Sequence, residues 1–272
     1  MSDYGKKIRL HRILGKPGKR ALVVAFDHAL VLGPIPGTED PVGQVRRFAQ
    51  ADADAVLLNL GLIRQFAQSP FIAEAPTFIA RIDWTTVWSV MSSGGEGELR
   101  SALLASPEDA LRSGADAVIT YMVIGTGDAD FERNEIARTA EVARECEQVG
   151  IPLIVESLAR GRQVGNPSDP KWLKLHSRMA AELGADAVKT DYSGDADSMR
   201  SVIQGCPIPI LVLGGSRHTS DESALDVVRG VVQAGAAGVF FGRNVFQADN
   251  MQSFLRQARA VLDGTEGPRK ER

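Results

Sequence analysis

One short pattern recurs four times in the chain and limits the folds that it can form. In three of the copies a glycine stands at the predicted end of a helix, where the chain often adopts a left-handed conformation that favours glycine. In all four copies an apolar strand is predicted to follow. Each copy therefore reads as a junction between a helix and a strand. The copies are ADADAV at 51–56, SGADAV at 113–118, LGADAV at 183–188 and AGAAGV at 234–239.

A second kind of junction lies between these copies, where proline introduces a β-branched run, as in IPLIVES at 151–157 and IPILVLGG at 208–215. Proline is tolerated at the start of a strand but not at its centre. With ALVVAFDHA at 21–29, the two kinds of junction predict eight strands, each followed by a helical pattern. The predicted strands are 21–28, 55–60, 76–82, 117–124, 152–157, 187–191, 209–214 and 238–243.

Near-continuous apolar strands that alternate with helices predict a parallel sheet that is buried on both faces. The repeat spans about two strand–helix units, which favours a closed (β/α)8 barrel of the TIM type over an open doubly wound sheet. The open sheet has less support because no GxGxxG motif follows the first strand. We expect one barrel domain over residues 1–272, with an N-terminal cap helix over 1–16 and a flexible tail over 265–272.

Composition narrows the class of protein. The chain has 272 residues, 44% hydrophobic and 24% charged, with a formal net charge of −3, as expected of a globular enzyme. We expect a cytoplasmic protein with no nucleic-acid or membrane partner. The four histidines have no metal-ligand spacing, so we expect no metal ion and no cofactor.

A lysine stands where a buried strand is predicted, in GADAVKTDYSG at 184–194. Lys189 shares a strand face with Ala187 and Asp191, and the small residues of that face suggest that it points into the barrel. A buried lysine needs a compensating charge, for which Asp27 and Asp191 are candidates. One interpretation is a structural ion pair. The other is catalytic, because burial favours a neutral amine that can attack a carbonyl and form an imine.

Imine chemistry also requires proton transfer, so a carboxylate or phenol should lie beside the lysine. Asp27, at the end of the first strand, is the first choice. Tyr121 on the fourth strand and His28 after Asp27 are further candidates, although both could be hydrogen-bonded structural residues. Near the ends of the fifth and third strands, Glu156 and Arg81 are charges on apolar strands that are expected to contact substrate, as is Asp191.

The seventh and eighth predicted strands both end in glycines, in LGGSR at 213–217 and FFGRNVF at 240–246. Glycines let backbone N–H groups approach an anion, and phosphate is commonly held after these two strands in such barrels. Arg243 would add a bidentate partner, unless it pairs with an acid of a helix. The predicted phosphate and substrate residues here are Gly214, Gly215, Ser216, Gly242 and Arg243.

The motifs VVAFDHALVLGP, GADAVKTDY, LVLGGSR and GVFFGRNVFQ resemble those of the DeoC/FbaB/LacD class I aldolases, and the match runs to about Gly264. This family includes archaeal-type fructose-bisphosphate aldolases, aminodideoxyheptulosonate synthases and the thiolase of autoinducer-2 processing. The resemblance implies that Lys189 forms the Schiff base, that Asp27 transfers protons and that the two glycine loops with Arg243 hold a phosphate. It also implies a homo-oligomer.

The fourth strand departs from the family pattern. Many members carry a tyrosine two residues before a glycine, whereas YMVIGTG places Val123 there. The acid–base role could pass to Tyr121, to His28 or to a bound water. We expect a metal-independent class I aldolase that acts on a phosphorylated ketose, such as fructose 1,6-bisphosphate. The alternatives are acyl transfer from a phosphorylated diketone to coenzyme A, and a non-catalytic barrel that binds a sugar phosphate.

Overall fold

The fold is a closed barrel of eight parallel strands, as the repeat predicts, and not an open sheet. The computed structural model describes residues 4–15, 18–94 and 97–266. Around the barrel the strands follow the order β1-β10-β9-β8-β7-β6-β3-β2, and every neighbouring pair is parallel. Their bounds are β1 (Ala21–Ala25), β2 (Ala55–Asn59), β3 (Phe78–Arg81), β6 (Ala117–Ile124), β7 (Leu153–Ala159), β8 (Ala187–Thr190), β9 (Ile210–Leu213) and β10 (Gly238–Phe241).

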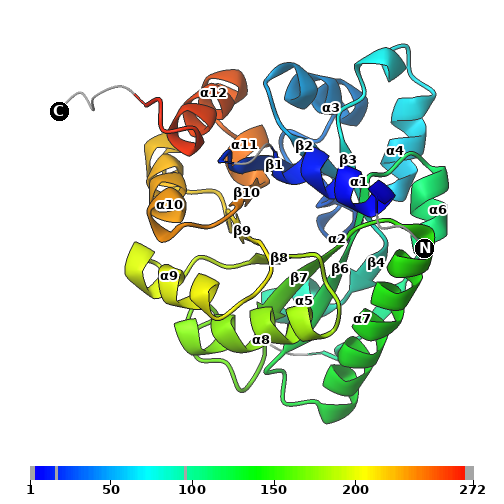
Figure 1. Cartoon of the computed structure of the whole chain (residues 1–272), viewed down its shortest axis with the longest axis vertical. Coiled ribbons are helices and arrows are strands. Elements are labelled where there is room, and N and C mark those ends of the chain that lie inside the picture. The colour runs from blue at the N-terminus through cyan, green and yellow to red at the C-terminus, as the bar shows by residue number, and fades with distance from the viewer. Residues whose placement is uncertain (1–3, 16–17, 95–96, 267–272) are drawn as a thin grey trace.

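Helices surround the strands on the outside of the barrel (Figure 1). Apolar side chains from the outward faces of the strands pack against these helices in one continuous layer. The helices are α3 (Pro41–Gln50), α4 (Leu60–Ala67), α6 (Pro107–Arg112), α7 (Ala129–Val149), α8 (Pro170–Glu182), α9 (Ala196–Gln204), α10 (Asp221–Ala234) and α12 (Met251–Leu262), with short helices α2 (Ala29–Leu32), α11 (Arg243–Phe246) and the 3-10 turn η1 (Ile72–Glu74).

The repeated junction has two structural roles. Its glycines Gly114, Gly184 and Gly235 have φ angles of 91°, 99° and 85°, the left-handed conformation predicted for a helix end. Two of its aspartates accept a hydrogen bond from the strand beside the one that they precede. The side chain of Asp54 accepts a hydrogen bond from Leu22 N at 2.7 Å, and that of Asp186 accepts one from Leu153 N at 2.8 Å. At these two junctions the repeat thus supplies both the entry to a strand and an acceptor for the strand beside it.

Helix α1 (Tyr4–Leu14) lies across the strands in the view of Figure 1. Its Ile13 is fully buried against the apolar residues inside the barrel, among them Ala21 and Ala117 at the starts of β1 and β6. The helix therefore covers the amino-terminal end of the barrel and leaves the opposite end for a site. Most of the tail predicted over 265–272 lies outside the described residues, and the division of the chain into one domain with a cap helix stays a prediction.

An insertion that the sequence did not predict follows β3. Strands β4 (Asp83–Thr85) and β5 (Ser101–Leu103) form a separate antiparallel pair, with helix α5 (Val87–Ser92) between them. Tyr121 and Leu158, from β6 and β7, pack against Val87 of this insertion. The insertion thus forms one wall above the carboxyl ends of the strands.

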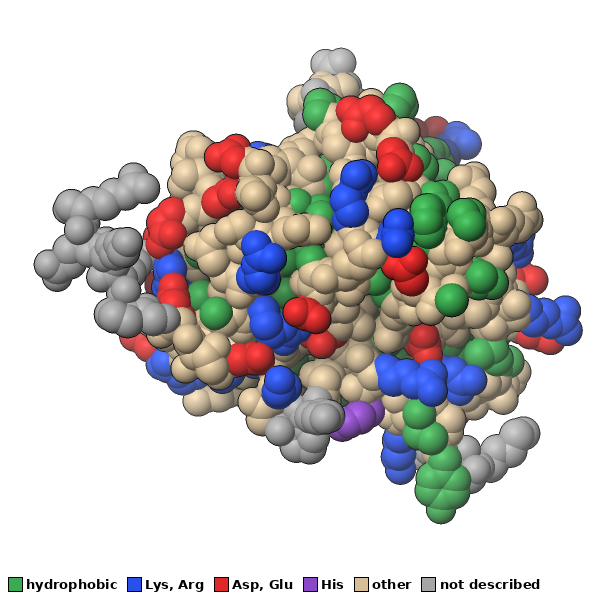
Figure 2. All heavy atoms as spheres, turned by 90° about the horizontal axis from the view of Figure 1, so that it is seen from above, with side chains coloured by type: hydrophobic (Ala, Val, Ile, Leu, Met, Phe, Trp, Pro, Cys, Tyr) green, Lys and Arg blue, Asp and Glu red, His purple; other side chains and the backbone are tan. Residues whose placement is uncertain are grey.

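The surface carries charges of both signs, and the face shown in Figure 2 has acidic and basic side chains interspersed. Among the described residues, no helix has the length and apolar character that crossing a membrane requires.

Candidate active site

A cavity of about 540 Å³ opens at the carboxyl ends of the barrel strands. It is lined by residues of β1, β6, β7, β8, β9 and β10 and of segments that follow several of these strands, together with Trp88 of the insertion. Every predicted site residue except Arg81 lines it, which places the two glycine loops and the buried lysine around one space. These residues are Asp27, His28, Tyr121, Glu156, Lys189, Asp191, Gly214, Gly215, Ser216, Gly242 and Arg243.

Lys189 is 5% exposed, and its amine faces Glu156. Glu156 and Lys189 are directly paired in the register of β7 and β8, and Nζ lies 2.9 Å from Oε1 of Glu156. The expectation that Asp27 or Asp191 forms the ion pair was therefore wrong. Nζ also lies 4.7 Å from the centre of the Phe240 ring, a cation–π contact that favours a charge at this position.

Arg81 lies beneath the cavity floor and is surrounded by carboxylates. Its Nε donates to Oδ2 of Asp27 at 3.0 Å, Nη1 donates to Oδ1 of Asp83 at 3.4 Å, and Nη2 donates to Oε2 of Glu156. The guanidinium also stacks 3.7 Å from the centre of the Tyr121 ring. All three of these nitrogen donors are directed at carboxylates of the protein. Arg81 therefore positions site residues, whereas the sequence predicted that it contacts the substrate.

Asp27 lies two residues beyond the end of β1 and is almost fully buried, at 7% exposure. Asn59 at the end of β2 donates to its backbone carbonyl at 2.9 Å, which fixes the turn. Burial alone would raise the pKa of Asp27, but the charges of Arg81 and Lys189 outweigh it and hold that pKa below its usual value. Asp27 is therefore a carboxylate at neutral pH, suited to accept a proton.

Tyr121 and His28 line the same cavity as Asp27, and their surroundings shift their pKa values in opposite directions. Burial, reinforced by the carboxylates of Glu156 and Asp27, raises the pKa of Tyr121 well above its usual value despite the nearby Arg81. Burial lowers the pKa of His28 despite the adjacent Asp27, whose Oδ1 lies 3.8 Å from Nδ1. At neutral pH the site thus holds a protonated phenol and a neutral imidazole.

The loops after β9 and β10 are fastened together by a residue that sequence reasoning missed. The side chain of Asn244 is fully buried, and its Nδ2 donates to the carbonyls of Gly214 at 2.8 Å and Ser216 at 3.1 Å. Its Oδ1 accepts from the backbone N–H of His218 at 2.8 Å. The sequence gives little sign of this role, because the residues that Asn244 contacts belong to a different loop.

Arg243 stands at the rim of this double loop. Within the described part of the chain it forms no ion pair, and its buried Nε has no hydrogen-bond partner. The alternative that it pairs with an acid of a helix therefore finds no support among these residues. An unpaired, half-buried guanidinium beside backbone N–H groups is a suitable place for an anion.

Arg160 is a second missed residue, since β7 runs two residues further than predicted and Arg160 follows it directly. It holds Asp191 through two hydrogen bonds of 2.8 and 3.0 Å, so the predicted substrate residue Asp191 has a protein partner. Arg160 also borders a neighbouring cavity of about 410 Å³ that lies against the insertion. Arg160 therefore lines both cavities.

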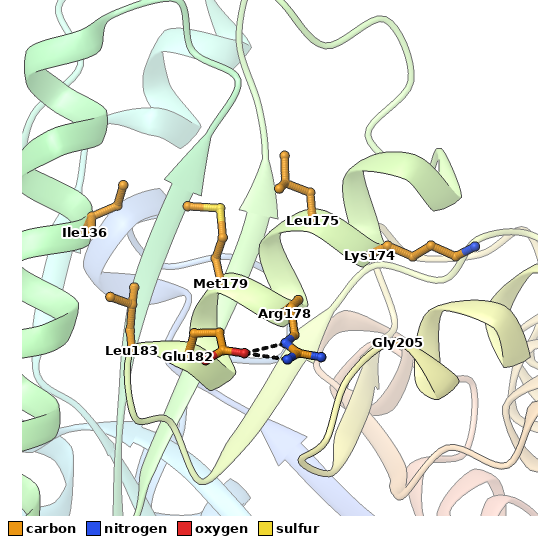
Figure 3. Close-up of a pocket in the computed structure, with 8 residues that line it drawn as sticks. All are labelled: Ile136, Lys174, Leu175, Arg178, Met179, Glu182, Leu183 and Gly205. Carbon is orange, nitrogen blue, oxygen red and sulfur yellow. Dashed lines mark hydrogen bonds and ion pairs between the residues drawn. The ribbon is translucent and has the colours of Figure 1, made fainter.

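Another hollow lies on the outside of the barrel, along α8 (Figure 3). Ile136, Leu175, Met179 and Leu183 make it apolar, and an ion pair between Arg178 and Glu182 crosses one side. None of the predicted site residues lines it. Among the described residues, no group of three or more histidine, cysteine, aspartate or glutamate side chains is placed to hold a metal ion.

Comparisons with known proteins agree with this geometry. Residues 21–248 match the model of the DeoC/LacD family aldolases. An aldolase of Saccharolobus solfataricus, described as uncharacterized, is 35% identical over 262 residues, which cover 95% of this chain and 94% of that protein. A 2-amino-3,7-dideoxy-D-threo-hept-6-ulosonate synthase of Halobacterium salinarum is 34% identical, with coverage of 91% and 87%.

A solved structure of a Schiff-base-forming fructose-1,6-bisphosphate aldolase superposes with a TM-score of 0.83 at 30% identity, covering 94% of this chain and 99% of that one. The barrel, the match to the family model and the identity over nearly the whole chain lead to one conclusion. This chain belongs to the DeoC/LacD family of aldolases and is a class I aldolase.

Proposed function

We propose that the enzyme makes or cleaves a carbon–carbon bond of a phosphorylated ketose, such as fructose 1,6-bisphosphate or a related ketose 1-phosphate, through an imine on Lys189. The observation that carries the proposal is the placement of a buried lysine amine in the same cavity as the unpaired Arg243 and the loops at Gly214 and Gly242. An amine and an anion site in one cavity fit a substrate with a carbonyl near a phosphate.

In the cleavage direction, Lys189 attacks the ketone and water leaves, which gives a protonated imine. A base removes the proton of the hydroxyl on C4, the C3–C4 bond breaks and an aldehyde departs. The bond electrons move into the imine to form an enamine, which is then protonated on carbon and hydrolysed. Asp27, held as a carboxylate by Arg81, is the proposed base, and the neutral His28 and protonated Tyr121 are proposed to assist proton transfer.

The phosphate is proposed to bind between the two glycine loops, with Gly214, Gly215, Ser216 and Gly242 offering backbone contacts and Arg243 the charge. The cavity beside Arg160 is proposed to accept the aldehyde partner. Relatives in this family have different names and activities: one is a fructose-bisphosphate aldolase of Thermoproteus tenax, 31% identical, and another is the heptulosonate synthase described above. The homo-oligomer and the cytoplasmic location stay predictions.

The proposal is tested by measuring cleavage of ketose 1-phosphates and condensation of dihydroxyacetone phosphate with a panel of aldehydes. The wild-type enzyme is expected to turn over at least one pair, and Lys189→Ala is expected to lose turnover while keeping its circular dichroism spectrum. Lys174→Ala, on the outer face of α8, is the matched control. Near-normal rates for Lys189→Ala would refute the imine. Product formation that requires coenzyme A would instead favour acyl transfer, the reaction class of a thiolase relative from Yersinia pestis at 28% identity.

A further inference from the structure

The strongest unassigned feature of the site is the contact between Lys189 and Glu156. Among the described residues, Glu156 is the one carboxylate within ion-pair distance of Nζ, at 2.9 Å. Both side chains are buried, with 5% of Lys189 and 4% of Glu156 exposed. The two residues are direct partners in the β7–β8 ladder, so the contact is set by the barrel itself and not by a loop.

The other candidate groups are turned away from the amine. Asp27 directs Oδ2 to Arg81 Nε at 3.0 Å and forms no ion pair with Lys189. Asp191 is held by both terminal nitrogens of Arg160. Val123, on β6, has an apolar side chain with no proton to give.

We infer that Glu156 is the residue that takes and returns protons at the Lys189 amine while the imine forms and is hydrolysed. The inference rests on the proposed imine function of Lys189. Glu156 is suited to this because its two oxygens have separate tasks: Oε2 is fixed by Arg81 Nη2, and Oε1 faces the reacting nitrogen.

The protons and charges balance with Glu156 alone. The lysine ammonium gives a proton to Oε1, leaving a neutral amine and a carboxylic acid. The amine attacks the ketone carbon, and a proton passes from nitrogen to the new alkoxide to give the carbinolamine. Glu156 then protonates the carbinolamine hydroxyl, the C–O bond breaks and water leaves. The products are a protonated imine and a Glu156 carboxylate, which pairs with the imine as it paired with the ammonium.

The test measures how fast the imine forms, separately from turnover. Enzyme and dihydroxyacetone phosphate are mixed, quenched with borohydride at increasing times and analysed by intact and peptide mass spectrometry over a range of pH. Glu156→Gln is expected to slow formation of the Lys189 adduct by at least about 100-fold, the usual scale of acid–base catalysis. It is also expected to change the pH profile of that rate, because protons must then pass to water. Glu182→Gln, the same change on the outer face of α8, is expected to match the wild type.

Adduct formation by Glu156→Gln as fast as, or faster than, the wild type would overturn the inference, because an ion pair that merely keeps Lys189 charged would slow attack. If Glu156→Gln does not fold, Glu156→Asp decides the question: it keeps the charge but withdraws the carboxylate, so slow adduct formation supports the role and an unchanged rate refutes it. A wild-type enzyme that gives no adduct on Lys189 would mean that the proposed function has failed, an outcome distinct from failure of the Glu156 role.

Discussion

Gly242 and His28 are packed so closely that no side chain fits at position 242. A Cβ placed on Gly242 would lie 2.4 Å from Cε1 of His28 and 2.9 Å from the carbonyl oxygen of Ala25. The loop after β10 therefore approaches the end of β1, and this brings the proposed phosphate site next to the proposed acid–base residues.

Replacing this glycine tests whether the close approach matters for catalysis. Gly242→Ala is expected to displace His28 or the β10 loop and to lower kcat/KM by about 100-fold, since a small misplacement of reacting groups has effects of this size. Steady-state kinetics with the best phosphorylated ketose measures the effect. Gly61→Ala in α4, where a Cβ meets nothing within 4 Å, is the control. Equal kinetics for both variants would show that the loop can shift without consequence.

Arg243 is expected to recognise the phosphate of the substrate. Arg243→Gln should raise KM for a phosphorylated ketose by about 10- to 100-fold, because a hydrogen bond to a charged group contributes about 1.5–3 kcal/mol. The same variant should have little effect on an unphosphorylated ketone. Arg256→Gln, an exposed change on α12, serves as the control. An unchanged KM for the phosphorylated substrate would place the anion elsewhere.

Arg81 is expected to stabilise the folded protein as well as to position the side chains of the site. Arg81→Met removes the cation that three buried carboxylates share, namely Asp27, Asp83 and Glu156. The free energy of unfolding should fall by about 3–5 kcal/mol, as when one partner of a buried ion pair is removed. Urea denaturation measures this. Arg100→Met, which removes an exposed ion pair with Glu98, should cost about 1 kcal/mol or less. A loss for Arg81→Met as small as that of the control would contradict the account.

His176 on α8 is expected to make the free energy of unfolding fall as the pH falls. The residue is fully buried, and within the described residues neither ring nitrogen has a hydrogen-bond partner. Burial, with the charge of Arg160, lowers the pKa of His176 from 6.5 to about 3. Below pH 6.5 the unfolded chain therefore binds a proton that the folded protein does not, so stability is lost as the pH falls.

The variant His176→Leu should lose this contribution. Between pH 6.5 and pH 4.5 the wild type should lose about 2–3 kcal/mol more of its free energy of unfolding than the variant, from 1.36 kcal/mol per pH unit for one proton. Urea denaturation at the two pH values measures the difference. An equal loss in both proteins would show that His176 takes up its proton in the folded state.

The sequence predicted the barrel because the repeat is built into every second strand entry. Gly184 and Asp186 mark one such entry, and their roles are local: a left-handed helix end and an acceptor for a neighbouring strand. The β4–β5 insertion escaped prediction because each of its strands has three residues, too few for an alternating pattern.

The sequence predicted that Lys189 points into the barrel, but not which side chain it contacts there. Alternation along a strand indicates which residues face the barrel interior, and it placed Lys189 there, whereas Glu156 was predicted only as a charge that contacts substrate. Which inward residues touch depends on the register between strands, which no single strand encodes. The partner of Lys189 was therefore assigned incorrectly, and Arg160 was missed because β7 extends beyond its predicted end to Ala159.

The most direct test of the account is peptide mass spectrometry after borohydride reduction of the wild-type enzyme with dihydroxyacetone phosphate, with fructose 1,6-bisphosphate in a parallel reaction. The account predicts a reduced adduct on Lys189 and none on the same peptide of Lys189→Ala. A protein that binds either compound but carries no adduct on Lys189 would contradict the imine mechanism.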